Sequence, residues 1–491
     1  MAEQGVAFPS HEGQRSTQRA SKDVVSHAVA EVDPALAAAV EGEREWRKRY
    51  PRHLRSMTAA AARSPQAAST IARAGLDRLH ATFEFVDADG ARPLDEAAAG
   101  APSVSLGTRV VEGGGGRPDG LVVPYRGRQL GGEALVEQAR DWARRGVVEP
   151  SFVAAIDRVV ANPGWLDLSG RTFALLGAGA EMGPTQHLLS WGADVAALDV
   201  PRPEVWQRLE DLARAGTGRL LVPTRPDGGD GADLLTEPAA IRAWLEGLDG
   251  PLLVGNYAYA DGEDFVRVAM GADAVIVSLQ RARDDVALAY LATPTDVFAV
   301  PFDAVEMARE RQRRGGAMGT FARVANTVTA GRGFVPSHRE TVRTDDGRQL
   351  GIADSLVVQQ GPNYALAKRL QRWRALVARQ DGAFSSVHVA PPTRTRSVTK
   401  NRVLAAAYAG AHAVDVEPFE PDTSRAVMAA LLVHDLHHEG AAANPGGGDP
   451  GTEHDLTAEA AHGGLWRVAW EPRSALPFAV AVGARALVRR G

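Results

Sequence analysis

The sequence predicts an α/β protein built around a doubly wound parallel sheet. Two observations predict this class. Short apolar runs alternate with amphipathic helical stretches from residue 172 to about 314, and the first run leads directly into a glycine-rich turn. Alternating strands and helices form a parallel sheet with helices on both faces, because each connecting helix packs back onto the sheet. The glycine turn after the first strand makes the predicted sheet Rossmann-type. We expect an N-terminal, mainly helical extension and a C-terminal segment that caps the sheet.

The bulk composition excludes several classes of protein. The chain has 491 residues. A single hydrophobic core rarely serves a chain of this length, so we expect several structural units. A net charge of -5 gives no reason to expect a nucleic-acid partner. We find no apolar run long enough for a membrane span and no signal peptide, and we expect a cytoplasmic homo-oligomer with a small-molecule substrate. The absence of cysteine excludes disulfides, thiolate nucleophiles and cysteine-based metal sites.

The N-terminal third divides into a tail and a helical region. Residues 1–25 are polar and lack hydrophobic periodicity, which predicts a disordered tail. Residues 26–165 are interpreted as a mainly helical region, with clear helical periodicity at 131–145 and 150–161. This region has no chemical motif that assigns it a role.

The predicted Rossmann-type domain covers residues 166–436. We expect an insertion at about 280–350, where the pattern becomes irregular and charged, and residues 437–491 form a loop and a C-terminal segment. The apolar run at 275–278 is interpreted as a further strand of the sheet. The other expected strands are 172–176, 194–198, 220–223 and 252–255, and the expected helices include 203–215, 237–247 and 303–314.

The glycine turn has the spacing GxGxxxG, formed by Gly177, Gly179 and Gly183. Glycines permit a tight turn and let the backbone approach a pyrophosphate, and the following helix start offers free N–H groups. Asp199 ends the second strand 22 residues after Gly177, where a carboxylate can accept the hydroxyls of an adenosine ribose. This arrangement favours NAD(H). Arg202 lies nearby and suits a 2′-phosphate, so NADP(H) remains open.

Two other interpretations of the glycine turn stay open. The turn can close a strand–helix unit without binding any ligand. Alternatively, an S-adenosylmethionine-dependent methyltransferase also has a glycine-rich loop after its first strand and an acidic residue after its second. Such enzymes usually carry an acidic residue just before the glycines, where this sequence has only the apolar residues 174–176.

A tyrosine and a lysine stand four residues apart at Tyr364 and Lys368. Residues at this spacing share one face of a helix. A free tyrosine has a pKa of about 10 and is a poor base at neutral pH, but a neighbouring ammonium group lowers that pKa. The pair can therefore exchange a proton with an alcohol or carbonyl. Only four of the 55 basic residues are lysine, so a tyrosine and a lysine rarely fall at this spacing by chance.

With this YxxxK pair after a glycine turn, the region from about 170 to 400 resembles the short-chain dehydrogenase/reductase family. The resemblance implies that Tyr364 is the proton donor or acceptor, that Lys368 is its partner, and that Ser355 supplies the hydroxyl that orients the substrate oxygen. Extended members of the family perform epimerisation or dehydration with similar residues.

The resemblance also implies further cofactor contacts. The segment that contains Pro391 and Thr393 looks like the family's strand followed by residues that touch the nicotinamide. Asn256 is similar in placement to the family's Asn-Ala-Gly element. Arg394 and Arg396 follow directly, and we expect them to bind a carboxylate or phosphate of the substrate, or else to form a solvated basic loop.

A histidine-rich stretch runs from His434 to His438. His434 and His438 share a helix face, but position 435 is Asp, so the HExxH order of zinc enzymes is absent. We interpret the stretch as a polar helix end and expect no metal site. The sequence thus predicts an NAD(P)-dependent oxidoreductase that acts on the carbonyl or hydroxyl group of a small organic substrate, which is anionic if Arg394 and Arg396 bind it. A methyltransferase and a non-catalytic nucleotide-binding scaffold are the alternatives.

Overall fold

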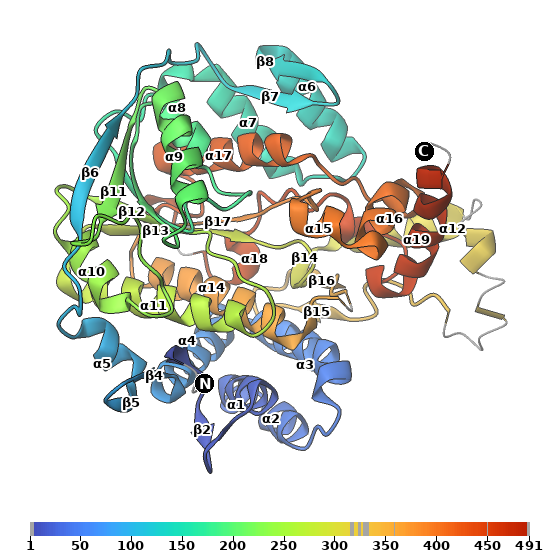
Figure 1. Cartoon of the computed structure of the whole chain (residues 1–491). Helices are drawn as coiled ribbons and strands as arrows, with labels where there is room; N and C mark the ends of the chain where they lie inside the picture. The colour runs from blue at the N-terminus through green and yellow to red at the C-terminus, as the bar shows by residue number, and fades with distance from the viewer. Residues whose placement is uncertain are drawn as a thin grey trace.

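A seven-stranded sheet runs through the centre of the protein (Figure 1). The computed structural model describes residues 4–314, 319–322, 326–327, 333–357, 359–448 and 450–488. Neighbouring strands are parallel except β6, which is antiparallel to β11. In spatial order the strands are β17 (Ser385–Val389), β13 (Val286–Ala292), β12 (Leu252–Asn256), β9 (Thr172–Leu176), β10 (Asp194–Leu198), β11 (Arg219–Thr224) and β6 (Gly107–Glu112).

The strand order reverses direction at β9. The chain moves from β9 to β10 and β11 on one side, then crosses to β12, β13 and β17 on the other. This 3-2-1-4-5-6 order is compatible with a Rossmann-like fold, whose ligands bind at the carboxyl ends of the strands beside the reversal point. Leu176 at the end of β9 pairs with Leu198 and with Asn256, so three strands end level with one another. The predicted α/β class with a mostly parallel central sheet is confirmed.

Different helices cover the two faces of the sheet. Alternate side chains of a strand point to opposite faces, so Phe173 and Leu175 join one core while Ala174 and Leu176 join the other. One face is covered by α8 (Thr185–Ser190), α9 (Pro203–Ala215) and α17 (Pro421–His437), and the other by α10 (Pro238–Glu246), α11 (Asp264–Ala282) and α14 (Gly361–Gln380).

The N-terminal region forms a further layer beneath α11 and α14, drawn in blue in Figure 1. The expectation of a disordered tail at 1–25 is corrected here. Val6 and Phe8 are buried, and β1 pairs with β4, because this apolar segment covers an otherwise exposed part of the core. The elements of this layer are β1 (Gly5–Ala7), β2 (Ser10–His11), β3 (Gln14–Arg15), α1 (Thr17–Val29), α2 (Pro34–Glu41), α3 (Trp46–Ala61), α4 (Pro65–Thr82), β4 (Glu84–Asp87), β5 (Gly90–Pro93) and α5 (Leu94–Ala99).

The next segment of the chain moves to the opposite side of the sheet. Strand β6 joins the sheet edge, and of the two helices that follow, α7 packs on α17 and α6 packs on α7 (Figure 1). The two helices expected at 131–145 and 150–161 are confirmed. These elements are β7 (Val122–Tyr125), β8 (Arg128–Gly131), α6 (Gly132–Arg144), α7 (Pro150–Ala161) and the 3₁₀ turn η1 (Pro163–Leu166).

A small antiparallel sheet lies between β13 and α14 in the chain. It occupies part of the expected insertion, of which 315–318, 323–325 and 328–332 lie outside the described residues. The strand expected at 275–278 is wrong: these residues belong to α11, in which residues 269–276 are all buried, so the short apolar run resembles a buried strand. The elements of the insertion are β14 (Val297–Pro301), α12 (Phe302–Arg314), β15 (Thr341–Arg343) and β16 (Gln349–Asp354).

The C-terminal part closes one end of the sheet with a tight helix pair, α16 and α19. A Cβ atom on Gly410 would lie 1.9 Å from the carbonyl oxygen of Ala479, so only glycine permits this approach. Within the described part of the chain, no helix has both the length and the hydropathy to cross a bilayer. The remaining elements are α15 (Arg396–Lys400), α16 (Arg402–Gly410), η2 (Ala411–Val414), η3 (Pro445–Gly447), α18 (Glu453–Leu456), η4 (Leu465–Arg467) and α19 (Pro472–Val488).

Candidate functional site

A cavity of about 2150 Å³ opens at the carboxyl ends of the sheet strands. Its walls include the residues that follow β9, β10, β12, β13 and β17, together with parts of α3, α14, α16 and α19. The cavity thus lies beside the point where the strand order reverses, which is where open α/β sheets bind their ligands. It is larger than most small-molecule pockets, which measure roughly 300–1,000 Å³.

The glycine loop forms one wall of this cavity. Gly177 has a φ of +80°, and a Cβ atom there would lie 2.6 Å from the Cα of Ala258. A glycine is therefore required at 177 by the backbone alone, whether or not a ligand binds. Gly177 and Gly179 line the cavity, whereas Gly183 is buried outside its lining.

The amide groups of this loop divide into bonded and free. Gly177 donates to the carbonyl of Leu198, and Gly179 donates to a carboxylate oxygen of Asp199 at 2.8 Å. Glu181 and Met182 also line the cavity, and in the described part of the chain their amides have no hydrogen-bond acceptor. These two amides are the donors that the loop can offer to a ligand. The helix that follows, α8, is only six residues long.

Asp199 stands at the end of β10 and faces the glycine loop. Burial raises the pKa of its carboxyl. The backbone amides of Gly179 and Val200 donate hydrogen bonds to the carboxylate and oppose this rise. The positive charges of Arg208 and Arg202 act in the same direction as these hydrogen bonds. The structure brings Asp199 and Arg202 to the same cavity wall, as the sequence predicts.

Asn256 ends β12 beside the glycine loop. Its side chain is 2% exposed and lines the cavity, and its Oδ1 accepts a hydrogen bond from the amide of Ala258 at 3.3 Å. Its Nδ2 is buried and has no partner among the described residues. A buried amide donor without a partner costs roughly 1–3 kcal/mol, so this atom is a natural contact for a ligand in the cavity.

Tyr364 and Lys368 line the cavity from the first turns of α14. Burial raises the pKa of the Tyr364 phenol, while hydrogen bonding with Thr293 and Gln360 acts in the opposite direction. The Lys368 ammonium donates to the carbonyl of Leu291 and to Oε1 of Gln371, each at 3.0 Å. It therefore bonds elsewhere than to the Tyr364 hydroxyl. Burial also lowers the pKa of Lys368 to about 8.

Ser355 does not take the place that the resemblance implies. Its side chain is 1% exposed and donates to the carbonyl of Leu465, outside the cavity lining. The hydroxyl near Tyr364 belongs to Thr293, which directly follows β13 and lines the cavity. Sequence reasoning missed Thr293 because the insertion separates it from Tyr364 in the chain. The signal that marks it is its position after an apolar strand.

The other residues taken from the resemblance fall into two groups. Pro391 and Thr393 line the cavity after β17, and the Thr393 hydroxyl is bonded to the carbonyl of Pro391 at 2.8 Å. Arg394 and Arg396 are exposed and do not line it. Arg394 pairs with Glu420 at 3.2 Å, so the solvated-loop interpretation describes these two arginines better.

The histidine-rich stretch lies outside this cavity. Helix α17 ends at His437, but His434 and Asp435 are almost fully buried, so they do not form the expected polar helix end. They contact His388 of β17 and Glu459 instead. Sequence reasoning missed both of these residues, since neither has a motif around it.

Comparison with known proteins gives no family assignment. No protein-family model matches the chain, and a search of curated proteins finds no significant match.

Proposed function

We propose that this chain is an NAD(P)-dependent oxidoreductase, a divergent short-chain dehydrogenase/reductase that acts on the carbonyl or hydroxyl group of a small organic substrate. One observation carries the proposal: Tyr364 and Lys368 line the same cavity as Gly177, Gly179 and Asp199. The glycine loop and the pair Tyr364 and Lys368 are about 180 residues apart in the chain, and each has a chemical motif of its own. Their meeting at the carboxyl ends of a parallel sheet is what a dinucleotide-dependent reaction requires.

The cavity offers the contacts that a nicotinamide dinucleotide needs. Asp199 would accept the adenosine ribose hydroxyls, the amides of Glu181 and Met182 would face the pyrophosphate, and the free Nδ2 of Asn256 supplies a donor deeper in the cavity. The fit favours NAD(H), because the carboxylate of Asp199 repels a 2′-phosphate. NADP(H) binding would depend on Arg202.

Proton transfer is assigned to Tyr364. A bound nicotinamide would supply or accept the hydride. Tyr364 would donate the proton to the substrate oxygen in reduction and remove it in oxidation. Thr293 bonds near the phenol and would help to orient that oxygen. Lys368 has three N–H donors, of which two are used by Leu291 and Gln371, so one remains for a cofactor ribose.

A second function, nucleotide binding without turnover, is favoured by one observation. The pKa of Tyr364 is raised by burial, and Lys368 bonds to Leu291 and Gln371 rather than to the phenol. A non-catalytic binder would keep the cofactor contacts and lose nothing when the Tyr364 hydroxyl is removed.

The test is a redox screen with a matched pair of tyrosine variants. Purified protein is supplied with NADH or NADPH and a panel of aldehydes and ketones, and with the oxidised cofactors and a panel of alcohols. Tyr364→Phe should lower kcat by roughly 10²–10⁴-fold, because it removes the proton donor. Tyr259→Phe is the control, since Tyr259 also lines the cavity but bonds to Asp261 at 2.8 Å and is half exposed.

Two results would contradict the proposal. Equal kcat for Tyr364→Phe and the unaltered protein would remove Tyr364 from the reaction. Nucleotide binding without turnover on any substrate of the panel would support the non-catalytic alternative.

A further inference from the structure

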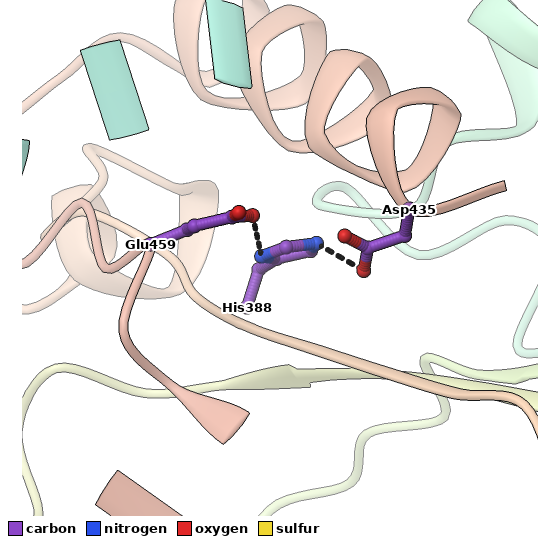
Figure 2. A group of neighbouring side chains, drawn as sticks. All are labelled: His388, Asp435 and Glu459. Atoms are coloured by element: carbon purple, nitrogen blue, oxygen red, sulfur yellow. Dashed lines mark ion pairs between the residues drawn. The ribbon is translucent and has the colours of Figure 1, made fainter. Parts of the chain in front are cut away.

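A cluster of two histidines and two carboxylates lies away from the cavity, on the α17 face of the sheet. We call it the His–carboxylate cluster: His388 of β17, His434 and Asp435 of α17, and Glu459 after α18. Figure 2 shows that His388 lies between the carboxylates of Asp435 and Glu459, which point toward it from different segments. Four side chains from three separate parts of the chain thus meet at one point.

The contacts of the cluster close into a ring. Nε2 of His388 lies 2.9 Å from Oδ2 of Asp435, and Nδ1 of His388 lies 4.0 Å from Oε2 of Glu459. Nδ1 of His434 lies 3.4 Å from Oδ1 of Asp435 and 3.5 Å from Oε1 of Glu459. Each carboxylate therefore contacts both imidazoles, one through each of its oxygens.

These spacings are close to those of ligands around one metal ion. Donor atoms at about 2.0–2.2 Å from a tetrahedral centre are about 3.4 Å from one another. The two contacts of Nδ1 of His434 match this spacing, and Nε2 of His388 is about half an ångström closer to Asp435. His388, Asp435 and Glu459 can each place one ligand atom within 4.8 Å of the other two.

The hydrogen bonding of His388 is incomplete. Its side chain is 5% exposed, and its Nε2 has no hydrogen-bond partner among the described residues although Asp435 lies within ion-pair distance. When an imidazole and a carboxylate lie this close without alignment, they gain no hydrogen bond from the contact. The same arrangement is normal for two ligands of one cation, because the lone pairs of both groups then point at the ion.

Burial makes the charge of the cluster important. The side chains of His434 and Asp435 are 1% and 3% exposed, and that of Glu459 is 18% exposed. Two carboxylates in such a place require compensating positive charge. A divalent cation supplies it at one point, and imidazole nitrogen with carboxylate oxygen is a ligand set that zinc accepts.

We propose that the His–carboxylate cluster binds one divalent transition-metal ion of the zinc class. His388, Asp435 and Glu459 would each supply one ligand atom, and His434 lies beside them. The role of the ion would be to fasten α17 and the segment around Glu459 to β17, the last strand of the sheet. The proposal is independent of the nucleotide chemistry in the cavity.

The experiment begins with the metal content of the full-length protein. The protein is purified without chelator or added metal and analysed by mass spectrometry for zinc, manganese, iron, cobalt and nickel. It is then stripped, and Zn²⁺ or Co²⁺ alone is added back. We expect about one ion per chain, a higher Tm with Zn²⁺, and a visible absorption band with Co²⁺ typical of a site with few ligands.

Matched variants separate the site from general histidine binding. Glu459→Gln and His434→Gln should lower Zn²⁺ affinity at least tenfold, whereas His437→Gln should not, because His437 stacks on Trp165 and lies outside the cluster. If a cluster variant fails to fold, the Co²⁺ spectrum of the unaltered protein still decides the matter. No change in Tm with Zn²⁺ and no Co²⁺ band would overturn the proposal and leave a buried ion-pair cluster.

Discussion

Helix α14 holds its positive charges in two different ways. Arg369, Arg372 and Arg374 are each paired with a buried carboxylate, either Asp296 or Asp273. Lys368 has no carboxylate within ion-pair distance among the described residues and donates to Leu291 and Gln371 instead. The arginines join layers of the fold together, whereas the lysine lines the cavity.

Breaking a buried arginine pair should have the largest effect on stability. Arg372 bonds to Asp296 at 2.7 Å, and both side chains are almost fully buried. Arg372→Met would leave Asp296 with a weaker partner in Arg369, so we expect a loss of about 3–5 kcal/mol in the free energy of unfolding. Urea unfolding followed by circular dichroism measures it.

The control for this experiment is an exposed arginine. Arg144 pairs with Asp141 on the surface at 3.3 Å, and Arg144→Met should cost less than about 1 kcal/mol. Equal losses for the two variants would mean that the buried network does not hold the layers together.

The pH dependence of stability gives a second view of the buried pair Arg374 and Asp273, which His80 of α4 also contacts. Burial opposes protonation of His80, but hydrogen bonds to Asp273 and Asp95 outweigh it and raise its pKa to about 9. Because the folded pKa lies above the ordinary 6.5, this stabilisation is complete below pH 6.5 and is lost as the pH rises through 9. The shift corresponds to a few kcal/mol, on the order of 3.

His80→Gln should remove this alkaline loss. The free energy of unfolding is measured between pH 6 and 10 for both proteins. The difference between them should shrink as the pH rises. A constant difference over that range would show that His80 is not charged in the folded protein.

Changing Lys368 in the cavity wall should affect NADH binding more than stability. Lys368→Met removes a buried charge without an ion-pair partner, so we expect the free energy of unfolding to change by less than about 1 kcal/mol or to rise. Affinity for NADH should fall about tenfold, or about 1.4 kcal/mol. It should fall in the unaltered protein as well when the pH rises through about 8, since the ammonium then loses its proton.

Isothermal titration calorimetry provides this measurement, with Lys22→Met as the control. Lys22 lies on α1, donates to the carbonyl of Glu41 and does not line the cavity. Unchanged NADH affinity in Lys368→Met would assign the lysine a purely structural role.

The sequence predicted the part of the fold where local signals and tertiary structure agree. The strands at 172–176 and 194–198 are short, apolar and followed by glycine or aspartate, so their ends and the cavity wall were found. The prediction failed at 275–278, because a helix buried on nearly all sides looks like a strand when only its apolar run is considered. It also failed at residues 5–25, where β1 pairs with β4 and Ala20, Val24 and Val25 of α1 are buried against other segments.

The candidate site divides in the same way. Gly177, Asp199, Tyr364 and Lys368 carry local spacing that reveals them, and they meet in one cavity. Thr293 has no motif, and its role depends on the insertion that brings it next to Tyr364. His388 and Glu459 of the His–carboxylate cluster become visible only when β17 and α17 are packed together.

We propose that the cavity at the glycine loop binds a nicotinamide dinucleotide. The most direct test is thermal unfolding of the purified protein with NADH, NADPH or S-adenosylmethionine, each added separately over a range of concentrations. At a hundred times its dissociation constant, a ligand adds about 2.7 kcal/mol of stability, which gives a measurable rise in Tm. We predict stabilisation by NADH, less by NADPH and none by S-adenosylmethionine. Stabilisation by S-adenosylmethionine alone, or by none of the three, would contradict the claim.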